Sequence, residues 1–170
     1  MRCALAPTPL DPVTSFPALT ELVVAGADLG SIGPVGNLAK LERFDAHDTR
    51  VSDISALSKC ALLQWLDLHS TRVQSLTAIA RLPHLDYVDV GDTPVASVAP
   101  LAQSPSLRSL WLPGSKVKSV APLASLRSLR ELMVPGGCDR SDVTALHRAR
   151  PDVRIMAWVE KSESEDPACF

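Results

Sequence analysis

The residues of this chain best suited to chemistry are aspartates and histidines that recur in its first half. Asp45 and Asp67 are each followed two residues later by a histidine, His47 and His69 respectively. Two carboxylates and two imidazoles are a donor set able to hold a divalent metal ion such as zinc. The series ends at Gly91, however, and side chains on neighbouring strands stand parallel to one another instead of converging. We therefore expect these residues to bind no metal ion.

A cysteine nucleophile is the second chemistry to consider, with Cys138 as the thiol and His147 as its base. Nothing in the surrounding sequence polarises this thiol. The four cysteines form no C-x-x-C pair, which indicates neither a zinc site nor a disulfide framework and is typical of reduced thiols. Glycine loops that cradle phosphates and the G-x-S-x-G motif are absent from the sequence. We expect no catalytic residues, no cofactor and no small-molecule substrate.

Short repeats are the elements that must position these side chains. Six leucines are spaced 22 residues apart: Leu19, Leu41, Leu63, Leu85, Leu107 and Leu129. Further apolar residues follow each leucine, so a full unit reads roughly L-x-x-L-x-L-x-x-T-x-V-x-x-V-x-x-L. The L-x-L alternation is the period of a strand with one buried face. A strand this short cannot bury its apolar side alone, so the units must stack about 4.8 Å apart over one core.

At these positions the sequence resembles a leucine-rich-repeat protein of the short-repeat type, which is internalin-like and phosphatase-regulator-like. The resemblance covers residues 16–159. It implies an α/β fold in which a right-handed superhelical solenoid carries short parallel β-strands on its concave face and 3₁₀ or short helical turns on its convex side. Proline in the return leg, as at Pro100 and Pro122, also favours a short turn over a full helix.

One position departs from the commonest pattern of that family, in which an asparagine after the strand ties neighbouring turns together. This chain has Thr49, Thr71, Thr93 and Ser115 at that place. A hydroxyl group is a hydrogen-bond donor as well as an acceptor. We therefore expect each threonine to donate to a carbonyl of the adjacent turn.

The sequence divides into three parts. Residues 1–15 hold three prolines without a clear register and form an N-terminal flank, a weak cap or a fragment of an earlier repeat. Residues 16–159 form the repeat domain with six registers, closed by a short helix that Ser141 caps and by a final strand around Ile155. Residues 160–170 are acidic and rich in serine, and we expect a disordered tail. Ser162 in this tail fits a site for an acid-directed kinase.

The residues between the buried leucines point outward onto the sheet and collect the rare residue types. Aromatic residues make up only 4% of the chain, yet the single tyrosine and two of the three tryptophans fall in this set. Exposed aromatic and methionine side chains are typical of protein interfaces, although the rings could also stack on one another or face a tail. The predicted partner-binding residues are Arg43, Asp45, His47, Trp65, Asp67, His69, Tyr87, Asp89, Trp111 and Met133.

The charges of the two halves differ. Residues 42–92 hold five basic and eight acidic residues, a net charge of −3, and the row of Asp45, Asp67 and Asp89 favours a partner with a basic segment. The family often has Asp at this step, so part of the acidic signal is shared with it. Residues 104–156 hold nine basic and four acidic residues, a net charge of +5. Most of these basic residues fall on loops or the return side, which favours a solvated surface over a nucleic-acid site.

We therefore expect a non-catalytic protein–protein interaction module that binds another protein on its concave β-face. Two alternatives stay open: a structural subunit of a large assembly, such as a ribonucleoprotein, and the substrate-recruiting part of a ubiquitin-ligase-type or effector protein. No stretch reaches the roughly 18 apolar residues that a membrane span requires, and the N-terminus is a poor secretory signal. We expect a cytoplasmic protein without membrane contact.

Overall fold

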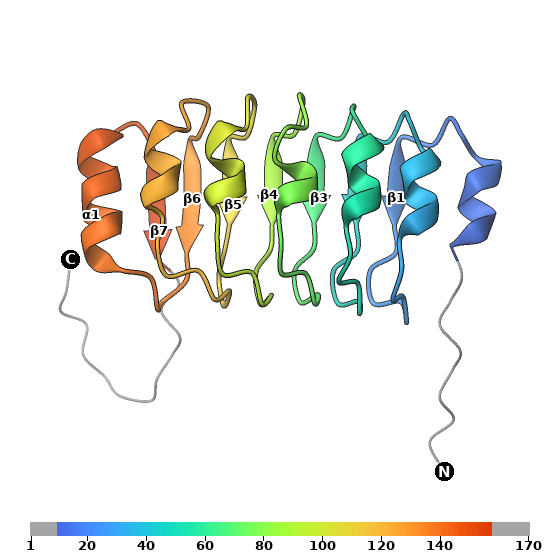
Figure 1. The fold of residues 1–170 in the computed structure, drawn as a ribbon, viewed down its shortest axis with the longest axis horizontal. Helices are drawn as coiled ribbons and strands as arrows, with labels where there is room; N and C mark the ends of the chain where they lie inside the picture. Colours follow the sequence, from blue (N-terminus) through green and yellow to red (C-terminus); the bar gives the residue numbers. More distant parts are fainter. Residues whose placement is uncertain (1–9, 158–170) are drawn as a thin grey trace, which may run out of the picture.

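The computed structural model describes residues 10–157, which form a solenoid of stacked turns (Figure 1). One parallel sheet holds seven strands in chain order. The strands are β1 Glu21–Val23, β2 Arg43–Asp45, β3 Trp65–Asp67, β4 Tyr87–Asp89, β5 Ser109–Trp111, β6 Glu131–Val134 and β7 Arg154–Ala157. We call the outward side of these strands the sheet face.

Short helices form a second layer on the opposite side of the molecule (Figure 1). Six 3₁₀ helices precede the strands: η1 Asp11–Ser15, η2 Gly33–Asn37, η3 Ser55–Lys59, η4 Thr77–Ile79, η5 Ala99–Gln103 and η6 Ala121–Ser125. Four of the six carry proline at their first or second position, where the missing N–H group costs no hydrogen bond. The predicted short return turns are therefore confirmed.

The core lies between the sheet and the helical layer and follows the 22-residue register. Leu63, Leu85 and Leu107 are fully buried, as are most of their equivalents in the other turns. Each such side chain contributes about 1.5–3 kcal/mol of transfer free energy before conformational entropy is subtracted. Leu19 and Leu22 are only half-buried, because they lie in the first turn and no described strand stacks before them.

The chain leaves strands β1 to β5 through turns in the left-handed backbone region. Asp48, Ser70 and Asp92 have φ angles of 55°, 54° and 49°, and Gly26 and Gly114 occupy the same position of their turns. The following threonine hydroxyls donate to carbonyls three residues earlier, as Thr71 Oγ1 does to Leu68 O at 2.7 Å. The expectation that they reach the adjacent turn is wrong, because backbone amides already make that link.

The backbone link between turns repeats through the stack. Asp48 N–H donates to His69 O at 2.9 Å, and Ser70 N–H donates to Gly91 O at 2.9 Å. Each turn is thereby held to the next at the point where the strand ends. These hydrogen bonds fix the end of each strand, and they therefore also fix the positions of the aspartates that end β2, β3 and β4.

Helix α1, Arg140–Ala149, and strand β7 close the C-terminal end. The side chain of Asp139 accepts the Ser141 N–H group at 2.7 Å, so Asp139 is the N-cap and the prediction of Ser141 in that role is wrong by two residues. An aspartate in extended backbone geometry is a strong cap, which leaves Ser141 inside the first turn. The tail of residues 160–170 and Ser162 lie outside the described residues.

Candidate functional site: the sheet face

The strand registers align the predicted partner-binding residues in columns across the sheet. Arg43 pairs with Trp65, which pairs with Tyr87, in the first column. The second column runs through Asp45, Asp67, Asp89, Trp111 and Met133 in adjacent strands. His47 and His69 lie two residues after the ends of β2 and β3 and flank these columns. All ten predicted residues therefore lie on one face.

The aromatic residues and one arginine form a continuous pile along the first column. The rings of Trp65 and Tyr87 stack with centroids 5.2 Å apart and an angle of 5° between their planes. The Arg43 guanidinium carbon lies 3.4 Å from the Trp65 ring centroid on the other side, and Arg43 Nε is 3.1 Å from a carboxylate oxygen of Glu21. Both faces of Trp65 are thus covered within the chain.

Trp111 joins this pile from the second column. Its ring centroid lies 6.4 Å from that of Tyr87, and the planes meet at 41°. Its Nε1 group is shielded from solvent and has no hydrogen-bond partner among residues 10–157. The three rings are half-buried and none belongs to the leucine core. We call Trp65, Tyr87 and Trp111 the aromatic ladder.

The three aspartates of the second column share one backbone contact. Asp45 Oδ1, Asp67 Oδ1 and Asp89 Oδ1 each accept the N–H group of the residue two positions later, at 3.2, 2.9 and 2.8 Å. One carboxylate oxygen of each aspartate therefore stabilises the start of the turn after its strand. This shared role explains why the residue type repeats with the period of the solenoid. We call these three residues the carboxylate row.

The carboxylate row is electrostatically strained at its centre. Burial raises the pKa of Asp67, and the neighbouring charge of Asp45 raises it further, against the lowering effect of the His69 amide hydrogen bond. Burial likewise raises the pKa of Asp89, and the charge of Asp67 adds to this effect. Among residues 10–157, no Lys or Arg side chain lies within ion-pair distance of either carboxylate.

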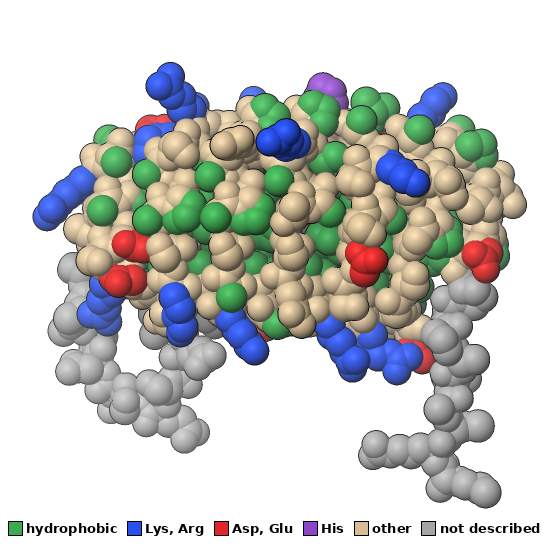
Figure 2. Space-filling model, viewed as in Figure 1, with side chains coloured by type: hydrophobic (Ala, Val, Ile, Leu, Met, Phe, Trp, Pro, Cys, Tyr) green, Lys and Arg blue, Asp and Glu red, His purple; other side chains and the backbone are tan. Residues whose placement is uncertain are grey.

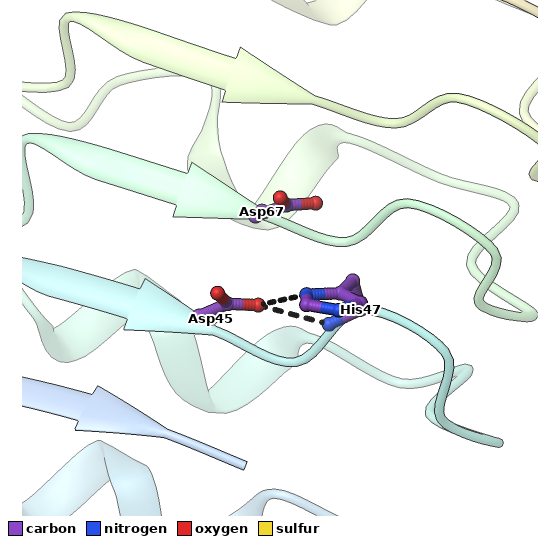
Figure 3. Close-up of side chains that lie close together, drawn as sticks. All are labelled: Asp45, His47 and Asp67. Carbon is purple, nitrogen blue, oxygen red and sulfur yellow. Dashed lines mark hydrogen bonds and ion pairs between the residues drawn. The ribbon is translucent and has the colours of Figure 1, made fainter. Parts of the chain in front are cut away.

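Asp45, His47 and Asp67 converge on one point (Figure 3). His47 Nδ1 lies 2.7 Å from Asp45 Oδ1, and one ligand atom from each of the three residues lies within 4.8 Å of the others. They are the one such group found among residues 10–157. The expectation of purely parallel side chains is therefore wrong for His47, because its ring folds back onto Asp45. A cation bound there would have to replace the existing hydrogen bond.

Two features of this face do not follow from the 22-residue repeat. Met156 pairs with Met133 and extends the second column by one strand. The step between them is 23 residues instead of 22, because α1 replaces the 3₁₀ helix of the last turn, so the repeat could not place Met156. The second feature is the stacking of Arg43 on Trp65. Both residues were among the predicted partner-binding residues, but this contact between them was not predicted.

The opposite face of the solenoid has a different surface. Figure 2 shows hydrophobic side chains in a band across the helical layer, with Lys and Arg side chains around its edges. The short helix η4 leaves a groove of about 720 Å³ there, lined mainly by small and apolar side chains such as Ala78, Leu82 and Pro100.

Arg150 differs from the predicted solvated arginines because its guanidinium donates to the carbonyls of Leu126 and Leu129.

The thiol considered as a nucleophile has the wrong surroundings for that role. Burial is the main cause that raises the pKa of Cys138, and a raised pKa disfavours the reactive thiolate. Its sulfur donates to the carbonyl of Lys118 instead of contacting a base.

Among residues 10–157, no helix is long and apolar enough to cross a membrane. The cytoplasmic location stays a prediction.

Comparisons with known proteins agree with this architecture. No family model and no curated protein matches the chain. An internalin, InlF, from Listeria monocytogenes matches with a TM-score of 0.63 and 25% identity over 82% of this chain and 48% of its own. Internalin C2 from the same organism matches with a TM-score of 0.76 and 25% identity over 89% and 66%. The leucine-rich-repeat protein LIC12759 of Leptospira interrogans reaches 0.77 with 17% identity over 84% and 38%.

The fold and these matches define the class: the chain is a leucine-rich-repeat protein with short repeats, folded as a solenoid. It spans less than two thirds of the length of each of the three matched structures. Proteins of this class generally serve as non-enzymatic interaction modules. The class therefore predicts binding to another protein and leaves the partner and the binding face undetermined.

Proposed function

We propose that this chain is a non-catalytic module that binds a partner protein across its sheet face. The observation that supports this most is the aromatic ladder, because three half-buried aromatic side chains lie together on a face that no described element packs over. Tryptophan and tyrosine contribute most of the binding energy in many protein interfaces. The partner carries basic groups that meet the carboxylate row, and contacts extend to Arg43, His47, His69 and Met133.

The face also has the mixed character of an interface. Its central strands carry the aromatic rings, Met133 and Met156 lie on the last two strands, and the histidines and the ion pair of Glu21 with Arg43 lie outside the rings. Interfaces of standard size have such an apolar centre and a polar rim. A structural role in a ribonucleoprotein has less support, since Arg130 and Arg150 of the basic half are engaged by Asp152.

The experiment is a cross-linking pull-down that compares the wild type with the double variant Trp65→Ala/Trp111→Ala. We expect the double variant to lose at least one partner, because truncating two central aromatic residues costs about 2 kcal/mol or more in many interfaces. Phe16→Ala is the matched control, because Phe16 is 62% exposed but lies after η1, away from the sheet face.

The fold of each variant is checked by circular dichroism before the pull-down. Loss of a partner from the double variant alone supports binding on the sheet face. Equal recovery of every partner by wild type, double variant and control would contradict it and direct attention to the helical layer.

A further inference from the structure

We propose that the sheet face recognises an arginine side chain of its partner, and that the guanidinium group binds between Asp67 and Asp89, beside Tyr87 and Trp111. This inference rests on the proposed function, because it names the chemical group that the partner inserts into that same surface. The occupant is therefore an arginine-bearing polypeptide segment.

Charge complementarity is the first argument. Asp67 and Asp89 lie opposite each other in adjacent strands, which are about 4.8 Å apart. Each uses Oδ1 to accept a backbone N–H group, and the Tyr87 hydroxyl donates a further side-chain hydrogen bond to the Asp89 carboxylate, whereas Asp67 accepts no other hydrogen bond from the described residues. His69 lies beside the pair, where its charge lowers the pKa of both carboxylates, and its Nε2 atom is 3.4 Å from Asp92 Oδ2. Two adjacent carboxylates thus have no Lys or Arg partner among residues 10–157.

The chain already contains an arginine site of the same composition on the same face. Arg43 is held by the Glu21 carboxylate at 3.1 Å and by the face of the Trp65 ring at 3.4 Å. Asp67 and Asp89 provide the carboxylates of a second such site, and Tyr87 and Trp111 provide the aromatic groups, but no arginine of residues 10–157 fills it. This parallel favours a guanidinium group as the missing component.

The geometry favours arginine over lysine. A guanidinium group is planar, has five N–H donors and packs against aromatic rings, so one group can bridge two carboxylates while it contacts a ring. A lysine ammonium group is a compact, strongly hydrated charge that gains less from the rings. The two carboxylates are partly buried, which also disfavours a cation that keeps its water shell.

A small residue leaves room for the partner chain on one side of this pair. Ser109 is the neighbour of Tyr87 in the first column. Gly91 follows Asp89, and a Cβ atom placed there would lie 2.6 Å from His69 Nδ1 and 3.1 Å from Asp89 Oδ1. Gly91 is buried, and His69 and Pro113 fill the space next to it, so the room beside the pair lies at Ser109.

The test uses three synthetic peptides that alternate glycine with arginine, lysine or citrulline, titrated into the full chain at about 0.15 M salt. Binding is followed by calorimetry and by backbone and indole NMR signals. We expect the arginine peptide to bind at least tenfold more tightly than the lysine peptide, and the uncharged citrulline peptide not to bind. The signals of His69 and Gly91, whose amides contact the two carboxylates, and the Trp111 indole signal should shift.

Two double variants separate this site from general charge effects. Asp67→Asn/Asp89→Asn should weaken the arginine peptide at least tenfold, while the asparagine oxygens still accept the backbone N–H groups. Asp53→Asn/Asp139→Asn is the matched control, because Asp53 and Asp139 make the same contact to the residue two positions later but lie off the sheet face. This control should bind the arginine peptide as the wild type does.

Equal affinity for the lysine and arginine peptides, or an equal loss in the control variant, would overturn the arginine site. If the arginine peptide fails to bind but Trp65→Ala/Trp111→Ala still loses a cellular partner, the arginine inference is wrong and the proposed function stands. If the arginine peptide binds as expected but no partner depends on the two tryptophans, the proposed function fails separately.

Discussion

The carboxylate row shows how one residue type serves two purposes at the level of single side chains. Oδ1 of each aspartate closes a turn, which asparagine or serine would also do. The negative charge is not needed for that contact, and at Asp67 and Asp89 burial raises the pKa, so the folded state disfavours the charge. Asp45 differs because it is only 8% exposed and is paired with His47. The charges of Asp67 and Asp89 are thus available for a partner.

His47 provides a residue-scale prediction through its pKa. The hydrogen bond to Asp45 is the largest cause that raises this pKa above 6.5, burial opposes it, and the charges of Asp45, Asp67 and Asp48 add to it. The stability that protonated His47 contributes is therefore fully present below pH 6.5 and is lost as the pH rises through the folded pKa. We expect Asp45→Asn to lower the pKa of His47 strongly and Asp67→Asn to lower it less.

An NMR titration of the His47 ring carbons and protons measures this directly in each variant. Asp53→Asn serves as the control, since Asp53 is absent from the groups that act on His47. An unchanged His47 pKa in the Asp45→Asn protein would show that the contact between the two side chains is not formed in solution.

At the level of elements, every strand depends on its neighbours because a strand of three or four residues has little stability of its own. Internal turns are covered on both sides, whereas the last turn needs a cap. Arg150 contributes to this cap, because its side chain is 14% exposed and donates to Leu126 O, Leu129 O and Asp152. The arginine thereby adds charged hydrogen bonds to carbonyls that also accept from Leu129 N–H and Arg130 Nη1.

We expect Arg150→Ala to destabilise the domain by about 2 kcal/mol, because buried carbonyls lose charged hydrogen bonds. Arg150→Lys should recover only part of this, since one ammonium group cannot replace the planar fork. Urea unfolding followed by circular dichroism measures both variants. Arg148→Ala, at an exposed position of the same helix, is the control, and an equal effect of the two alanine variants would disprove the capping role.

The solenoid as a whole carries its charges asymmetrically along its axis. Residues 42–92 have a net charge of −3 and residues 104–156 a net charge of +5. Because seven strands stacked about 4.8 Å apart span roughly 30 Å, a basic partner approaching the carboxylate row is also repelled by the other half. The Debye length is about 30 Å at 0.01 M salt and about 8 Å at 0.15 M. This repulsion should therefore matter only at low salt.

The charge-reversal variant Lys116→Glu/Lys118→Glu tests this property of the whole molecule. Both lysines are exposed. We expect the variant to associate with the arginine peptide severalfold faster than the wild type at about 0.01 M salt and at nearly the same rate at 0.15 M. Stopped-flow fluorescence of the tryptophans measures the rates. A difference that persisted at 0.15 M would indicate direct contact between the lysines and the peptide.

The positions of the outward residues could be predicted because the side chains of a strand alternate between two faces and the repeat determines the register. Trp65, Tyr87 and Asp89 therefore appear where the sequence places them. The same reasoning failed where the period changed, at Met156, and where a contact depended on side-chain rotamers. The ring of His47 and the guanidinium group of Arg150 turn toward partners that no spacing in the sequence identifies.

The sequence alone determined that this protein is a stack of short parallel strands over a leucine core, because hydrophobic burial with a constant period allows one arrangement of the backbone. Only the tertiary structure decided that Trp65 is covered by Arg43 and Tyr87, and that Asp67 and Asp89 are left without a cation. The physical reason is that such contacts depend on side-chain conformation and local burial across adjacent strands, and these arise only when distant residues are brought together.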